Sequence, residues 1–269
     1  MYKYPIHFIF ALAIVFSFTS CGNEPLDDDF PVNQNPNPNN PGSPTDPGEG
    51  STGDYWPTAV DNIWVYDTEN ADGSTNENDY EMISETTFEG LPAFELDNFF
   101  VQSQLDAFDD PTIELTGYLI KNEGNYSYYV PGSETNELGF MTTFQPLNYV
   151  FFKDYLEEGE SFSDSFTFSL TISFEGDEDG IDFEPIDVST TLDYTITVVQ
   201  RDYEMTINEE TFENVIHLNF ASSYFDEEFN QTISSESDVY FAKDIGPIKI
   251  VDQNPTEGFT SEITSYELN

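Results

Sequence analysis

The sequence predicts an all-β protein: a curved antiparallel sheet with long hairpins, arranged as a half-barrel or as a sandwich. Two long segments, 162–174 and 186–198, alternate apolar and polar residues with a period of two. Turn-forming residues separate these segments from each other and from their neighbours. No stretch carries apolar residues at helical spacing for more than two turns. Strands that are apolar on one face must cover that face, which requires the sheet to curl or to stack.

The clearest element is the hairpin formed by these two segments. From Phe162 to Phe174, the even positions are apolar except Asp164, and the odd positions are all Ser or Thr. Successive side chains of a strand point to opposite faces, so one face is apolar and the other is rich in hydroxyl groups. The second segment, 186–198, repeats this pattern, and the Gly- and Asp-rich stretch 175–180 between them is typical of a hairpin loop.

Shorter strands follow from shorter alternating runs, which Gly90, Pro111, Gly124, Pro131 and Gly246 punctuate. We predict them at 62–67, 78–86, 91–95, 98–105, 113–121, 125–130, 148–153, 212–221, 229–234, 238–242, 246–251 and 259–267.

The N-terminus has the features of a secretion signal. Lys3 is followed by an apolar run from Phe8 to Phe16, which is too short for a comfortable membrane span. Thr19 and Ser20 then precede Cys21, the only cysteine of the chain. Small residues directly before a cysteine, after such a run, resemble the signal of bacterial lipoproteins. The resemblance implies that residues 1–20 are cleaved as a signal peptide and that Cys21 is acylated.

Residues 21–54 are then predicted to be the lipidated cysteine and a tether. This segment holds seven of the 16 prolines and few apolar side chains, so it cannot bury enough surface to order itself. If flexible, it would span about 30 Å on average. Residues 55–269, rich in Phe, Tyr, Ile, Val and Thr, are predicted to form a single β domain, a size that is normal for all-β architectures.

The charge of the chain excludes several functions. With 53 Asp and Glu against six Lys and Arg, the formal net charge is −47, which repels nucleic acid. One cysteine cannot form an internal disulfide or a cysteine-based zinc site, and two histidines leave little for imidazole-based metal sites. We therefore expect no nucleic-acid partner. The acidic run Asp27–Asp29, soon after Cys21, resembles a surface-export signal.

One acidic loop has the spacing of a calcium ligand set. Glu175, Asp177 and Asp179 alternate before Gly180, as in the first half of an EF-hand loop. The twelfth position is Ile186, which cannot ligate, although Asp182 or Glu184 could substitute. We treat Ca²⁺ as the one candidate cofactor, with a solvated hairpin tip as the alternative.

Candidate catalytic groups are sparse. His217 alternates with Ile216 and Leu218, which predicts that the imidazole points outward, without a nucleophile motif beside it. In a chain with 53 acids, a carboxylate pair suited to glycoside hydrolysis is weak evidence. Tyr126 and Tyr128 share one strand face, and are expected to pack in the core rather than to stack on sugars.

Motifs at both ends of the domain resemble a family of bacterial surface lipoproteins that has no established activity. The N-terminal motif is Tyr55-Trp56-Pro57 followed by a Trp64-Val65-Tyr66 strand. The C-terminal motifs are Phe212-Glu213-Asn214-Val215 and the hairpin Tyr240-Phe241-Ala242-Lys243-Asp244-Ile245-Gly246-Pro247-Ile248-Lys249. The residues themselves indicate structural roles, since Trp64 and Tyr66 share a strand face and Gly246-Pro247 forms a turn.

Together these patterns predict a lipoprotein of the outer membrane that faces the cell exterior or the periplasm. Acyl chains on Cys21 would anchor it in the membrane, and more than one chain gives stable anchoring. Its β domain is expected to act as a non-catalytic binding or structural module with a glycan or protein partner. Two alternatives remain: a carrier of lipid or another hydrophobic ligand on a concave sheet face, and a carboxylate-dependent glycoside hydrolase.

Overall fold

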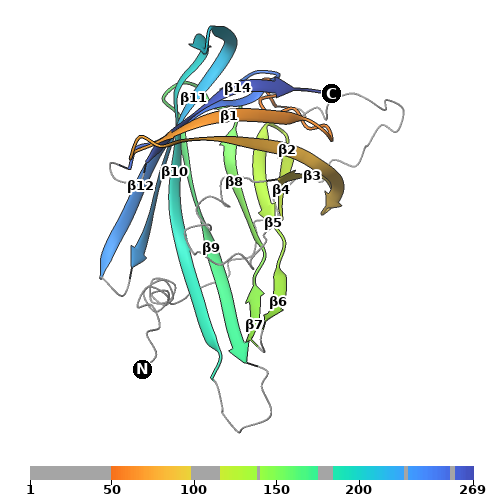
Figure 1. Ribbon diagram of the computed structural model, residues 1–269, viewed down its shortest axis with the longest axis vertical. Helices are drawn as coiled ribbons and strands as arrows, with labels where there is room; N and C mark the ends of the chain where they lie inside the picture. Colours follow the sequence, from red (N-terminus) through yellow and green to blue (C-terminus); the bar gives the residue numbers. More distant parts are fainter. Residues whose placement is uncertain (1–49, 98–115, 138–139, 175–183, 227–229, 255–257) are drawn as a thin grey trace.

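The computed structural model describes residues 50–97, 116–137, 140–174, 184–226, 230–254 and 258–269. These residues form a single antiparallel sheet of 14 strands that is not closed into a barrel, and it is the sole layer (Figure 1). The half-barrel expectation is therefore closer to the fold than the sandwich. None of the described residues belongs to a helix long and apolar enough to cross a membrane.

The strands follow the chain from Ile63 to Glu267. They are β1 (Ile63–Asn70), β2 (Thr75–Phe88), β3 (Leu91–Asp97), β4 (Gly117–Asn122), β5 (Asn125–Val130), β6 (Ser133–Glu137), β7 (Phe140–Phe144), β8 (Leu147–Lys153), β9 (Ser161–Phe174), β10 (Ile186–Ile207), β11 (Glu210–Asp226), β12 (Gln231–Ala242), β13 (Gly246–Asp252) and β14 (Phe259–Glu267). Their order across the sheet is β6-β7-β9-β10-β11-β12-β13-β14-β1-β2-β3-β4-β5-β8.

The predicted long hairpin is confirmed as β9 and β10. They pair without a register shift from Ser161 opposite Thr197 to Ile172 opposite Ile186. Their hydroxyl-bearing faces are joined by cross-strand bonds, such as Ser163 to Thr195 at 2.8 Å and Thr167 to Thr191 at 2.9 Å. In Figure 1 this hairpin extends well below the strands β1, β2 and β14, which cross the upper part of the molecule.

Tight turns with left-handed residues connect several strands. Asn208 and Glu209 both have positive φ, 48° and 70°, between β10 and β11. Such two-residue turns match the right-handed twist of the strands that they join. Beyond this turn the pairing of β10 with β11 shifts register three times between Val198 and Met205. Extra residues of this kind bend a strand, which lets the long strands follow the curvature of the sheet.

Curvature brings the last strand of the sheet, β8, against β9. The ring of Tyr149 stacks on that of Phe166 at 4.6 Å, and the Tyr194 hydroxyl donates to the carbonyl of Val150 at 2.7 Å. The core lies inside this curl and is rich in aromatic side chains. Its largest fully buried side chains are those of Trp56, Trp64, Tyr55, Tyr66, Tyr126, Phe152, Phe212 and Phe241.

Candidate functional site

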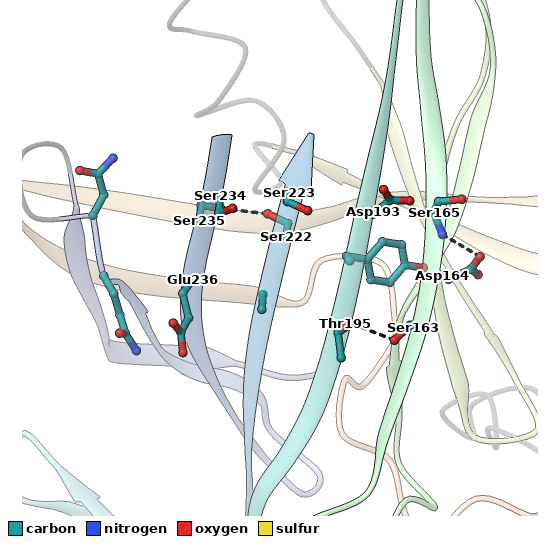
Figure 2. A pocket seen from close by; sticks show the side chains of 14 residues that line it. Ser163, Asp164, Ser165, Asp193, Thr195, Ser222, Ser223, Ser234, Ser235 and Glu236 are labelled. Atoms are coloured by element: carbon teal, nitrogen blue, oxygen red, sulfur yellow. Dashed lines mark hydrogen bonds between the residues drawn. The ribbon is translucent and has the colours of Figure 1, made fainter. Parts of the chain in front are cut away.

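A broad depression lies across strands β9 to β12 (Figure 2). One tripeptide of each strand contributes to it, and residues 253 and 254 close one side. Its volume is about 780 Å³ and it is open to solvent. The lining residues are Ser163, Asp164, Ser165, Asp193, Tyr194, Thr195, Ala221, Ser222, Ser223, Ser234, Ser235, Glu236, Gln253 and Asn254.

Hydroxyl groups dominate this depression, and four of them form hydrogen-bonded pairs across neighbouring strands. Ser163 pairs with Thr195 at 2.8 Å, and Ser222 pairs with Ser235 at 2.9 Å, as Figure 2 shows. Asp193 and Glu236 are exposed there, and no Lys or Arg is among the lining residues. The depression therefore presents hydrogen-bond acceptors and negative charge, which favours a neutral hydroxylated ligand or a cationic one over an anionic one.

A second polar group, on β11, β12 and the start of the 253–254 segment, surrounds Asp238. His217 Nε2 lies 2.8 Å from its Oδ1, and Gln253 donates to its Oδ2 at 2.6 Å. Asn219 bridges Asp238 and Glu236 at 3.3 and 2.9 Å. Burial acts to raise the pKa of Asp238, but the hydrogen bonds from His217, Asn219 and Gln253 outweigh it and hold that pKa below its usual value.

His217 therefore differs from the isolated outward side chain that the sequence predicted. It does lie on the face opposite Ile216 and Leu218, which are both buried. Its side chain is 17% exposed, however, because the ring stacks on Tyr240 at 4.3 Å and binds Asp238. The cross-strand pairing of β11 with β12 places Tyr240 directly opposite His217, a relationship that alternation alone does not give.

The third notable region is where the predicted tether enters the domain. Asp154, which is fully buried, accepts hydrogen bonds from the Ser51 hydroxyl at 2.5 Å and from the Thr52 N–H at 3.0 Å. Burial raises the pKa of the Asp154 carboxyl, and these two bonds and the charge of Arg201 oppose that rise. Asp154 thus fixes the chain just before the first aromatic residues of the core.

Three cationic side chains form hydrogen bonds at this junction, although the chain has few Lys and Arg residues. Lys243 Nζ donates to the Thr52 carbonyl at 3.0 Å, and Arg201 donates to Thr52 Oγ1 at 3.2 Å and to the carbonyl of Leu156. Lys121 Nζ, almost fully buried, is 3.0 Å from both oxygens of Asp54 and from the Trp56 carbonyl. The described residues contain two further cations, Lys153 and Lys249.

The apolar stripe of β9 is partly covered by the protein's own side chains, which bears on the carrier alternative. Tyr149 stacks on Phe166 and Phe144 packs against Phe168 at 5.0 Å. Leu170 is buried. Part of the surface that a bound lipid would contact is therefore already in contact with β7 and β8, while Phe166 and Phe168 stay half-buried.

The remaining predicted site residues divide into two groups. Cys21, and the candidate calcium ligands Glu175, Asp177 and Asp179, lie outside the described residues, as do the predicted strand 98–105 and residues 1–49. Within the described part of the chain, no group of three or more His, Cys, Asp or Glu side chains is placed to hold a metal ion. Tyr126 and Tyr128 are buried, as expected for core residues.

Comparisons with known proteins give two structural likenesses. The sequence matches no protein-family model and no curated protein. A candidate lipoprotein from Parabacteroides distasonis is 10% identical, with a TM-score of 0.42 over 80% of this chain and 99% of that one. A candidate exported protein with a YmcC-like fold from Bacteroides fragilis is 10% identical, with a TM-score of 0.44 over 80% of this chain and 100% of that one.

Proposed function

We propose that this protein is a lipoprotein of the outer membrane, anchored through acyl chains on Cys21, whose β domain is a non-catalytic binding or structural module. The observation that carries the proposal is the position of the chain's only cysteine, directly after Thr19-Ser20 and a short apolar run. An acylated cysteine with two or more chains holds a protein stably on a membrane.

The junction between tether and domain supports this arrangement. Ser51 and Thr52, at the end of the predicted tether, are hydrogen-bonded to Asp154, Lys243 and Arg201. Tyr55 and Trp56, which follow at once, are buried in the core. A tether that is continuous with the core transmits any pull from the membrane to buried aromatic residues of the domain rather than to a frayed end.

The character of the two faces of the sheet supports a binding or structural role over a carrier. The apolar face is partly covered by the protein's own aromatic rings, whereas the depression on β9 to β12 is open and rich in hydroxyl and carboxylate groups. Polar, solvent-exposed surfaces of this kind suit a glycan or a protein partner, because both offer hydrogen-bond donors.

Acylation is tested by metabolic labelling with palmitate in a bacterial host that makes lipoproteins. We expect label on the unsubstituted chain, none on Cys21→Ser, and release of Cys21→Ser from the membrane fraction. The matched control combines Cys21→Ser with Ser43→Cys, which keeps one thiol in the tether but away from Thr19-Ser20. Absence of label on the unsubstituted chain, or label that persists in Cys21→Ser, would contradict the proposal.

The location is tested separately, by adding a protease to intact cells. A domain on the outer face is digested in intact cells, whereas a domain in the periplasm is digested only after the outer membrane is permeabilised. Both results agree with an outer-membrane lipoprotein. Protection in permeabilised cells under conditions that digest a periplasmic control protein would argue against an envelope location.

A further inference from the structure

The first seven residues of β10 have one strand neighbour, whereas the residues that follow them have two. From Asp193 to Thr197 β10 pairs with both β9 and β11, but from Ile186 to Leu192 its register includes β9 alone. In Figure 1 this part of β10 forms the border of the long hairpin on the side away from β9. With β6 and β7 on the other side of β9, it completes a four-stranded wing that projects from the body of the sheet.

The main-chain groups of three residues point out from this border. Val198 donates to the Glu160 carbonyl and accepts from the Gly159 N–H, so its main chain faces the β9 side. Residues of a strand alternate in this respect, and the pairing of β9 with β10 has no register shift between 186 and 197. The even residues of β10 therefore face β9, and the N–H and C=O groups of Asp187, Ser189 and Thr191 face outward.

A hydrogen bond on the side of β9 away from β10 leads to the same assignment of outward-facing residues. The Ser169 carbonyl accepts from the Gln145 N–H, so Ser169 faces away from β10. Its partner across the ladder is Ser189, which must then face away from β9. Within the residues that the structure describes, no hydrogen bond satisfies the outward main-chain groups of Asp187, Ser189 and Thr191.

The composition of this border is unusual for a free edge. Natural sheet edges are protected by lysines, prolines, bulges or short length, because an open row of N–H and C=O groups accepts another strand. The segment Ile186-Asp187-Val188-Ser189-Thr190-Thr191-Leu192 has no proline, no bulge and one charge, and it is rich in residues that favour strands. Such a segment is suited to being paired.

The segment is also complementary to itself. If two copies meet antiparallel on a two-fold axis through Ser189, the apolar Ile186 lies opposite Leu192 of the other copy. Val188 then lies opposite Thr190, and Asp187 opposite Thr191, so the carboxylate meets a hydroxyl donor. The outward N–H groups of each copy meet the outward C=O groups of the other, because 187, 189 and 191 pair among themselves.

We propose that the Ile186–Leu192 edge of β10 is a dimerisation edge, on which a second copy of this chain adds its own β10 to form one continuous sheet across a two-fold axis. The interface does not depend on acylation of Cys21. On a membrane, however, an anchor would raise the local concentration of copies and favour the dimer.

The salt dependence of the association distinguishes a second copy of this chain from a basic strand of another protein. The two-fold arrangement keeps Asp187 of one copy about 13 Å along the strand from Asp187 of the other, since each residue advances about 3.3 Å. That separation exceeds the screening length of about 8 Å at physiological salt. The total charge of each copy still repels the other, so self-association must strengthen as salt increases, whereas binding of a basic segment must weaken.

The test uses the full chain with Cys21→Ser, so that an introduced cysteine is its sole thiol. Ser189→Cys places thiols of two copies opposite each other on the axis, and Ser165→Cys places an exposed thiol on β9, away from the edge. We expect mild oxidation to give a covalent dimer with Ser189→Cys and little with Ser165→Cys. Sedimentation of the cysteine-free chain is expected to show a dimer fraction that grows from about 0.05 M to about 1 M NaCl.

A second pair of variants tests the same edge without oxidation. Ser189→Glu brings two carboxylates face to face on the axis and is expected to weaken dimerisation at least tenfold, while Ser165→Glu adds the same charge on β9 and leaves it unchanged. Cooperative thermal unfolding of both variants establishes that they fold. The proposal is overturned if the chain is a monomer throughout, if both cysteines cross-link equally, or if salt weakens the association, which would favour a basic partner.

Discussion

Trp64 and Ile245 are joined by a hydrogen bond across a separation of 181 residues: the indole Nε1 donates to the Ile245 carbonyl at 2.6 Å. Two residues further along β1, on the same face, the hydroxyl of Tyr66 donates to the Pro247 carbonyl, also at 2.6 Å. The strand Trp64-Val65-Tyr66 near the start of the domain and the hairpin 240–249 near its end thus meet in space. Their roles in this chain are structural, because both aromatic side chains are buried and their polar atoms hold the β12–β13 turn.

Tyr66→Phe isolates the contribution of this hydrogen bond, because the substitution removes one oxygen and little volume. The Pro247 carbonyl is left without this donor, so we expect a loss of about 1–2 kcal/mol in the free energy of unfolding. Urea denaturation followed by tyrosine and tryptophan fluorescence measures it. Tyr129→Phe is the control, because no hydrogen bond to its hydroxyl is found among the described residues. Equal effects of the two substitutions would show that the Tyr66 bond contributes nothing specific.

Lys121 and Asp54 form the most buried ion pair of the described residues, with 2% and 13% of their side chains exposed. Asp54→Asn leaves a buried ammonium without its counter-ion, which we expect to cost about 3–5 kcal/mol. The double variant Lys121→Met with Asp54→Leu removes both charges and should recover much of that loss. Lys249→Met, at the more exposed pair with Glu262, should cost less than about 1 kcal/mol.

These stabilities are compared by chemical denaturation of the three variants and the unsubstituted chain. If the double variant is as unstable as Asp54→Asn, the junction depends on the geometry of the pair rather than on charge balance. If Lys249→Met is as harmful as Asp54→Asn, burial is not what distinguishes the two pairs.

The raised pKa of Asp154 predicts a pH dependence with a defined sign. Because its pKa is higher in the folded state than the usual 3.8, the folded protein holds more protons than the unfolded chain between the two values. Its contribution to stability therefore falls as pH rises through that window. Asp154→Asn cannot titrate, and its amide can still accept from Thr52 and donate to Ser51.

We expect the difference in melting temperature between Asp154→Asn and the unsubstituted chain to change across that window, in favour of Asp154→Asn at the higher pH. Differential scanning calorimetry from acid to neutral pH measures it. Asp193→Asn, which removes an exposed carboxylate, controls for the change in net charge. A constant difference between Asp154→Asn and the unsubstituted chain at all pH values would contradict the prediction.

The sequence predicted long, strongly alternating strands well and short or polar ones poorly. β9 and β10 were anticipated because Phe, Leu and Ile alternate with Ser and Thr over many residues. β6 and β7 were missed, since Ser133–Glu137 is wholly polar and Phe140–Phe144 is too short to show a period. They are strands because β9 offers β7 an edge, and β7 offers one to β6. These strands therefore depend on pairing with distant parts of the chain, which the local alternation of residues does not reveal.

The division of β12 failed for a related reason. We expected two strands, 229–234 and 238–242, which left residues 235–237 between them. The structure instead has one strand, Gln231–Ala242, since β11 pairs with it without a register shift from Val215 to Asp226. The candidate site was missed in the same way: its Ser, Thr and acidic residues come from four strands, and pairing register alone brings them together.

Three acidic side chains lie side by side on adjacent strands of the sheet. Asp67 on β1 lies directly opposite Glu77 on β2 and opposite Glu262 on β14. Lys249 binds Glu262 at 2.5 Å, and this bond offsets one of the three charges. Like charges directly opposite each other in a sheet are destabilising, by a few tenths to about 1 kcal/mol. In a chain with a formal net charge of −47, distant cations do little to relieve this repulsion.

Asp67→Asn should therefore stabilise the domain at low salt, and the gain should shrink as salt increases. The screening length falls from about 30 Å at about 0.01 M to about 3 Å at about 1 M, so the repulsion that the substitution relieves is weak at the upper limit. Asp193→Asn is the matched control, because its cross-strand neighbours are Ser165 and Ser223 rather than acids. Melting temperatures of both variants across this range measure the effect. A gain for Asp67→Asn that is independent of salt, or one that Asp193→Asn equals, would mean that overall charge rather than the cross-strand row limits stability.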